Sequence, residues 1–178
     1  MHRLFAAIRP PAEIREKLLS IMEGIRGARW QDDGQLHLTL RFIGEVERHQ
    51  AEDIALALGQ VRHPPFEIAL DGIGQFDGNG ARGGLWVGVT PHDALRHLHK
   101  AVDSALRRAG VPPEGRAYLP HITIARINSS SGPVSDFVAV QGTIASAPFA
   151  VDSFCLYESF LSAGGARYEI VERYPLLS

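Results

Sequence analysis

The segment HLTL, residues 37–40, occurs a second time in slightly altered form as HITI, residues 121–124. In both segments polar and apolar residues alternate, which is typical of a β-strand with one buried face. Because side chains alternate across a strand, the histidine and the threonine of each segment share the face opposite the core. We therefore expect two similar strands, each of which presents one imidazole and one hydroxyl group.

The sequence around these two strands repeats as well, with offsets of 81 to 84 residues. Each half begins with an apolar strand and an amphipathic helix, and a further strand follows its His-x-Thr segment. The opening strands are residues 3–8 and 85–89, the helical apolar positions are Ile14, Leu18, Ile21, Ile25 and Leu95, Leu98, Val102, Leu106, and the later strands are residues 66–70 and 149–152. The order of elements therefore indicates an internal duplication.

This duplication predicts an α+β fold rather than two unrelated domains. We expect a single bilobal domain, residues 1–178, whose pseudo-symmetric halves are residues 1–80 and 82–178. The antiparallel-type sheets of the halves would face a central groove, with the helices on the outside. The two His-x-Thr segments would then meet at that groove.

The halves differ in a few places that the pattern also predicts. A helix at residues 49–61 separates two strands of the first half, whereas SSSGP at residues 129–133 predicts a loop at the matching place. The final strand, residues 167–174, has no counterpart. The alternation changes phase at Gly72 and near residues 152–153, which predicts a bulge or bend in each later strand.

Composition excludes several classes of protein. The formal net charge of -2 excludes the strong positive field that draws proteins along nucleic acid, so local groups must hold any phosphate. The one cysteine, Cys155, excludes an internal disulfide and cysteine-rich zinc sites, and we expect it to be buried. No apolar run approaches the roughly 20 residues of a membrane helix. We expect a cytoplasmic monomer with no membrane association.

The repeated histidine and threonine point to proton transfer at a phosphate. One His-x-Thr triplet is weak evidence for a site, but two at matching positions of a repeat are strong evidence. Histidine can accept or donate a proton near neutral pH, and opening a cyclic phosphodiester requires both acts. Threonine hydroxyl groups can donate hydrogen bonds to the non-bridging oxygens. Since no third ligand accompanies either motif, we expect neither a metal nor another cofactor.

These residues resemble the two-histidine phosphoesterase superfamily, and in particular its RNA 2',3'-cyclic phosphodiesterase branch, also called the 2'-5' RNA ligase family. The similar segments are RLFAAI (3–8), LHLTLRFIGEV (36–46), PHITIAR (120–126), LYES (156–159) and YPL (174–176). The resemblance implies hydrolysis of 2',3'-cyclic phosphates on RNA ends or nucleotides to 2'-phosphomonoesters, and the reverse 2'-5' joining reaction. It implies that His37 is the proton donor and His121 the proton acceptor, with Thr39 and Thr123 beside them.

Two arginines are candidates for substrate binding. Arg126 matches a phosphate-binding arginine of the family, although strict alternation puts it on the opposite face from His121, so a local bulge is required. Strict alternation places Arg41 on the same face of the strand as His37. It is either a second substrate contact or a solvated charge. Phe42 and Trp30 have the chemistry to stack on a base, but core packing is the favoured interpretation of both.

Two other functions remain open from the sequence. A non-catalytic module could bind nucleotides or RNA ends in the same groove, although two complete motifs argue against it. An enzyme of the same chemistry could instead act on another cyclic or 2'-5' phosphodiester, such as an ADP-ribose cyclic phosphate or an oligoadenylate. The binding module would bind nucleotides without turnover, so an activity assay distinguishes it from an enzyme. A panel of substrates distinguishes an RNA-end phosphodiesterase from an enzyme that acts on another phosphodiester.

Overall fold

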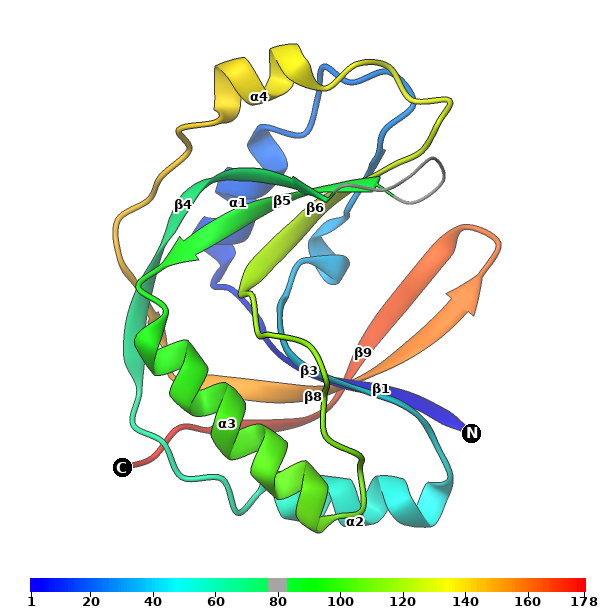
Figure 1. Ribbon diagram of the computed structural model, residues 1–178, viewed down its shortest axis with the longest axis vertical. Coiled ribbons are helices and arrows are strands. Elements are labelled where there is room, and N and C mark those ends of the chain that lie inside the picture. Colours follow the sequence, from blue (N-terminus) through cyan, green and yellow to red (C-terminus); the bar gives the residue numbers. More distant parts are fainter. Residues whose placement is uncertain (77–82) are drawn as a thin grey trace.

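The computed structural model describes residues 1–76 and 83–178, and one curled antiparallel sheet forms its centre (Figure 1). The sheet order is β7-β4-β5-β6-β3-β1-β8-β9, and β2 pairs with β6. The strands are β1 (His2–Ile8), β2 (Arg29–Trp30), β3 (Leu38–Val46), β4 (Phe66–Phe76), β5 (Gly83–Thr90), β6 (His121–Ile127), β7 (Phe149–Val151), β8 (Ser153–Ser162) and β9 (Gly165–Pro175). The helices are α1 (Ala12–Ser20), the 3-10 turn η1 (Asp33–Gln35), α2 (Arg48–Leu58), α3 (Asp93–Arg108) and α4 (Ser135–Gln141).

The order of the strands shows how the duplicated sequence is used. Between β4 and β8, equivalent strands of the two halves occupy mirror-related places in the sheet. The two His-x-Thr strands, β6 and β3, lie side by side at the centre, the opening strands β5 and β1 flank them, and the later strands β4 and β8 lie outside. The later strand of each half crosses over, so β4 pairs with β5 and β8 pairs with β1. The predicted α+β class with antiparallel sheets is confirmed, but the two sheets join into one. We propose that residues 1–178 form one bilobal domain built in this way.

The helices cover the outer side of the sheet. Helix α3 contacts β3 and α2, and Figure 1 shows α2 and α3 together below the part of the sheet formed by β3, β1 and β8. Helix α4 contacts β4 at the other end of the molecule. In the part of the chain that the structure describes, no helix is both long and apolar enough to cross a membrane.

A β-bulge lies just after each His-x-Thr pair. In the pairing of β1 with β3, Ala7 and Ala6 face Thr39 and Arg41, so Leu40 is an extra residue. In the pairing of β5 with β6, Ile124 is the extra residue in the same way. A bulge shifts the alternation by one position, so the side chains beyond it change face. This shift determines which arginine reaches the groove.

The backbone carbonyls at the two bulges bond outside the strand ladder. The carbonyl oxygen of Leu40 lies 2.7 Å from His99 Nδ1, which donates to it, and the Thr39 carbonyl accepts from the Tyr118 hydroxyl at 3.0 Å. On the other side, the Gln31 N–H donates to the Ile124 carbonyl at 2.9 Å. Because buried backbone acceptors need partners, these contacts stabilise both bulges.

Most of the predicted local features are present. The helix expected at residues 49–61 is α2, the last strand is β9, and Cys155 is buried. The later strand of the first half bulges at Gly72, whose positive φ of 75° favours glycine, and β7 and β8 are separated at Asp152. Helix α4 was not predicted. It follows the expected loop at residues 129–133, and its seven residues are too few for a clear helical pattern.

Two buried clusters lie on opposite faces of the curled sheet. The larger one lies under the helices and contains Leu38, Leu40, Ile122 and Ile124, the apolar residues of both motifs. The smaller cluster consists of Phe5, Ala7, Cys155 and Tyr157, with Tyr168 packed against it. The smaller cluster lies on the same face of the sheet as the two histidines, and the imidazole ring of one of them packs against it.

Candidate active site

The two His-x-Thr pairs meet where the halves of the sheet join. Leu38 of β3 pairs with Ile122 of β6, so the neighbouring histidine and threonine of each motif flank this pair on the opposite face. Diagonal neighbours in a regular antiparallel pair are roughly 7–8 Å apart, which leaves room for a phosphate between two imidazoles. Both motifs line one cleft of about 730 Å³, and their side chains there are His37, Thr39, His121 and Thr123.

Aromatic side chains hold both imidazole rings. The His37 ring lies 4.8 Å from the ring of Phe5 and 5.3 Å from that of Tyr168, measured between centroids. The ring of His121 meets Phe76 edge-on at 5.0 Å. These contacts restrict the orientation of each ring and remove water from one side of it.

Hydrogen bonds define the tautomer of each histidine. His37 Nδ1 lies 2.8 Å from the carbonyl oxygen of Gln35, and His121 Nδ1 lies 2.7 Å from that of Leu119. A carbonyl oxygen only accepts, so both Nδ1 atoms carry hydrogen. When the rings are neutral, each Nε2 therefore has a free lone pair, and that of His37 accepts a hydrogen bond from the Thr39 hydroxyl at 3.0 Å.

The surroundings lower the pKa of both histidines. Burial is the main cause for His37, whose pKa falls to about 4, and the nearby positive charges of His121, Arg126 and Arg9 lower it further. The hydrogen bond to Gln35 acts in the opposite direction. Burial and Arg126 also lower the pKa of His121. In the unliganded protein both rings are therefore neutral near pH 7.

The first prediction concerns the titration of His37. Histidine-labelled protein observed by NMR should show the His37 ring protonating at about pH 4 without ligand. A bound nucleotide 2'-phosphate should raise this midpoint, because an adjacent anion stabilises the imidazolium form. The His37→Gln variant assigns the resonance. A midpoint near 6.5 in the free protein, or no upward shift with ligand, would contradict this account of the site.

Arg126 reaches the cleft, as the predicted bulge requires. The extra residue Ile124 places Ala125 in the core and returns Arg126 to the face of His121. The corresponding bulge in β3 has the same effect on Phe42, which lines the cleft with 61% of its surface exposed. The core-packing interpretation of Phe42 is therefore wrong.

Arg41 is not a cleft residue, so the expectation that it binds substrate is wrong. The bulge at Leu40 turns Arg41 toward the core, where it is 4% exposed. Its Nε donates to Asp103 at 2.9 Å, and its terminal nitrogens donate to the carbonyl oxygens of Phe42 and Pro112. Arg41 thus anchors β3 to α3. The alternative, a solvated charge, is wrong for the same reason.

Several cleft residues were not predicted from the sequence. Tyr168 comes from β9, Gln35 from η1 and Arg116 from the segment before β6. The Gln35 side chain also donates to the Ala166 carbonyl at 2.7 Å, which ties η1 to the hairpin of β8 and β9. None of these positions carries a motif, and only the fold brings them together. Trp30, in contrast, packs against Phe137 at 5.4 Å, as core packing predicts.

The described residues contain no group of three or more histidine, cysteine, aspartate or glutamate side chains arranged to hold a metal ion. The polar groups nearest the centre of the cleft are the two imidazoles and the two threonine hydroxyl groups, and Arg126 lines the same cleft. With one lone pair on each Nε2, the pair can accept a proton on one side of a phosphate and donate one on the other.

Comparisons with known proteins agree with this geometry. An Escherichia coli (strain K12) protein named RNA 2',3'-cyclic phosphodiesterase is 32% identical over 178 residues, which cover 98% of this chain and 96% of that protein. A protein of the same name from Archaeoglobus fulgidus is 29% identical over 170 residues, covering 94% and 96% of the two chains. The crystal structure of E. coli LigT complexed with 3'-AMP has a TM-score of 0.79 and 30% identity, with 99% of both chains covered. A family model described as the 2'-5' RNA ligase superfamily matches residues 10–159. The chain therefore belongs to the 2'-5' RNA ligase superfamily, as the resemblance of its motifs implied.

Proposed function

We propose that this protein hydrolyses RNA or nucleotide 2',3'-cyclic phosphates to 2'-phosphomonoesters, with His37 and His121 as an acid and base pair. One observation carries the proposal. Two equivalent His-x-Thr pairs, from the two halves of the repeat, line the same cleft on neighbouring strands. In-line displacement at phosphorus needs a base and an acid on opposite sides, and a pseudo-symmetric pair of histidines supplies both.

The proton transfers balance in a single displacement step. Nε2 of His121 accepts a proton from the attacking water, whose oxygen forms a bond to phosphorus. The bond from phosphorus to the ribose O3' breaks, and that oxygen takes a proton from Nε2 of His37. The product is a 2'-phosphomonoester with a free 3'-hydroxyl, and proton exchange with solvent restores both rings. When a 5'-hydroxyl attacks the cyclic phosphate in place of water, the same two roles join it through a 2'-5' bond. The roles exchange when that bond is cleaved back to the cyclic phosphate.

His37 must gain a proton before it can act as the donor. Its pKa of about 4 would leave it neutral at pH 7. An anionic phosphate against Nε2 favours the charged form, so substrate binding itself prepares the acid. His121 has its Nε2 lone pair available in the neutral ring, which suits a base.

Thr39, Thr123 and Arg126 would hold the phosphate. Their side chains line the cleft beside the histidines, and hydroxyl and guanidinium groups donate hydrogen bonds to the non-bridging oxygens. The Thr39 hydroxyl donates a hydrogen bond to His37 and would turn to the phosphate when substrate binds. These donors stabilise the charge that develops during displacement.

The comparisons support the same class of substrate. Several relatives are named RNA 2',3'-cyclic phosphodiesterase, and LigT was crystallised with 3'-AMP and with phosphate. Both motifs come from one chain, which supports a monomer as the active unit. A single buried cysteine is compatible with the reducing cytoplasm, where we place the protein. Turnover of an ADP-ribose cyclic phosphate or an oligoadenylate in preference to RNA ends would redirect the substrate assignment.

The test is an assay of the purified protein with a 2',3'-cyclic mononucleotide after treatment with a chelator. We expect complete conversion to the 2'-phosphate, identified by its difference from the 3'-isomer in chromatography, at a rate that chelation leaves unchanged. Binding without turnover would instead favour the non-catalytic module. Loss of activity on chelation, with recovery on adding back a divalent metal, would refute the metal-independent mechanism.

A further inference from the structure

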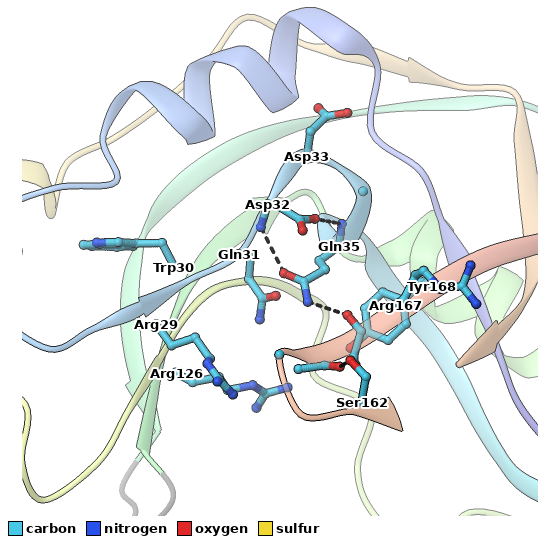
Figure 2. Close-up of a pocket in the computed structure, with 14 residues that line it drawn as sticks. Arg29, Trp30, Gln31, Asp32, Asp33, Gln35, Arg126, Ser162, Arg167 and Tyr168 are labelled. Carbon is cyan, nitrogen blue, oxygen red and sulfur yellow. Dashed lines mark hydrogen bonds between the residues drawn. The ribbon is translucent and has the colours of Figure 1, made fainter. Parts of the chain in front are cut away.

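A second cavity opens beside the catalytic cleft, between β2, η1 and the hairpin of β8 and β9 (Figure 2). Its volume is about 760 Å³, within the range of roughly 300–1,000 Å³ of small-molecule pockets. The two cavities share several lining residues, namely Gln31, Gln35, Arg126, Ala166 and Tyr168. A ligand that fills the cleft can therefore extend into the second cavity without leaving the surface.

Two arginines meet at the boundary of this cavity. Arg29 of β2 lies directly opposite Arg126 of β6 in the antiparallel pairing, and Figure 2 shows their side chains running together into the cavity. The guanidinium of Arg29 reaches toward the β8–β9 hairpin, since a β-carbon at Gly165 would lie 3.8 Å from its Nη1. Like charges directly opposite each other destabilise a sheet. An anion bound between the two guanidinium groups would offset this repulsion.

The carboxylates of the cavity do not supply that anion. Asp33 forms ion pairs with Arg9 at 3.1 Å and Arg15 at 2.9 Å, and in Figure 2 it points away from the two arginines. Asp32 accepts a hydrogen bond from the backbone of Gln35, which caps η1. Within residues 1–76 and 83–178, neither Arg29 nor Arg126 forms an ion pair with a carboxylate.

The third arginine of the cavity, Arg167, already has interaction partners. Arg167 pairs with Glu169 at 2.6 Å and lies over the ring of Phe160 at 4.7 Å. Its charge is therefore balanced on the hairpin itself. Among the residues that the structure describes, the positive charge of the cavity that pairs with no carboxylate lies at Arg29 and Arg126, next to the cleft in which the cyclic phosphate would react.

We propose that this cavity binds the phosphodiester on the 5' side of the reacting nucleotide, with Arg29 as the residue that recognises it. The inference rests on the proposed function. An RNA end with a 2',3'-cyclic phosphate carries a second phosphate on its 5' oxygen, whereas a mononucleoside cyclic phosphate does not. Arg126 lines both the cleft and this cavity, whereas Arg29 lines this cavity and not the cleft, so Arg29 distinguishes an RNA strand from a free nucleotide.

The test compares two substrates with the Arg29→Gln variant. For a dinucleotide that ends in a 2',3'-cyclic phosphate, kcat/KM should fall about tenfold, the effect of losing one charge-assisted hydrogen bond. For the 2',3'-cyclic mononucleotide with a free 5'-hydroxyl, kcat/KM should be unchanged. The Arg48→Gln variant removes the same charge from an exposed position of α2, and it should change neither value.

Stability gives an independent readout. If Arg29 binds a phosphate, removing one member of the like-charged pair should leave the Tm of the free protein equal or higher. A lower Tm, equal losses on both substrates, or no loss on either would each overturn the assignment. If the wild type turns over neither substrate, the hydrolase proposal fails by itself. In that case, the Kd of the dinucleotide 2'-phosphate, measured by calorimetry for the wild type and for Arg29→Gln, tests the subsite independently of catalysis. A weaker Kd in the variant supports the subsite, and an equal Kd overturns it.

Discussion

The His37→Gln and His121→Gln variants are each expected to lower kcat for a 2',3'-cyclic nucleotide by about 10²–10⁴-fold, the range for loss of a positioned acid or base. Glutamine keeps a polar side chain of similar reach but cannot transfer a proton near neutral pH. Because the two rings act on the same phosphate in one step, the double variant should be little slower than the worse single variant. Steady-state kinetics measured under saturating substrate supply these values.

The His97→Gln variant is the matched control, because His97 is exposed on α3. Its kcat should equal that of the wild type. Circular dichroism should show that all three variants fold. Full activity in both His37→Gln and His121→Gln would remove the chemical basis of the proposed function, and activity lost in only one would show that a single histidine does the work.

The Thr39→Val and Thr123→Val variants carry the second largest expected effect, about 10²–10³-fold in kcat for loss of one donor to the transition state. Valine has nearly the same shape as threonine, so the loss reports the hydroxyl group and not a change of packing. Thr39→Ser and Thr123→Ser keep the hydroxyl and should retain most of the activity. The same assay, with a series of substrate concentrations, separates effects on kcat from effects on KM.

The Thr143→Val variant, in an exposed loop, is the control for these substitutions and should leave kcat unchanged. A rise in KM at constant kcat would show that the threonines bind substrate and transition state equally well. That result would contradict their role in stabilising charge during displacement. Equal losses in the serine variants would show that the methyl group, and hence packing, is what matters.

Local pattern was sufficient for the central features of the site. Alternation of side chains places His37 with Thr39 and His121 with Thr123, whatever the surrounding fold, because it follows from the geometry of a single strand. The repeat predicted that the two pairs belong together, and the structure places both in one cleft. Arg126 is predicted by the resemblance to the family and not by local pattern, because strict alternation puts it on the opposite face from His121. The structure contains the bulge that its place in the cleft requires.

Strict alternation predicted the wrong face of the strand for Arg41 and Phe42, because the bulge at Leu40 depends on the pairing of β3 with β1. Nothing in the segment itself marks the extra residue. The hydrogen bonds that stabilise the bulge come from His99 and Tyr118, more than 50 positions away in the chain. A one-residue shift reverses the side chains that directly follow it, so Arg41 enters the core and Phe42 enters the cleft.

The sequence by itself thus determined the α+β class, the duplication and the four polar groups at the centre of the site, because these depend on the period of a strand or helix. The tertiary structure decided the exchange of later strands between the halves, the register of β3, and the approach of Arg29 and Tyr168 to the site. These features depend on hydrogen bonds and packing between segments far apart in the chain. Local periodicity contains no information about which distant strand will pair with which, or in what register.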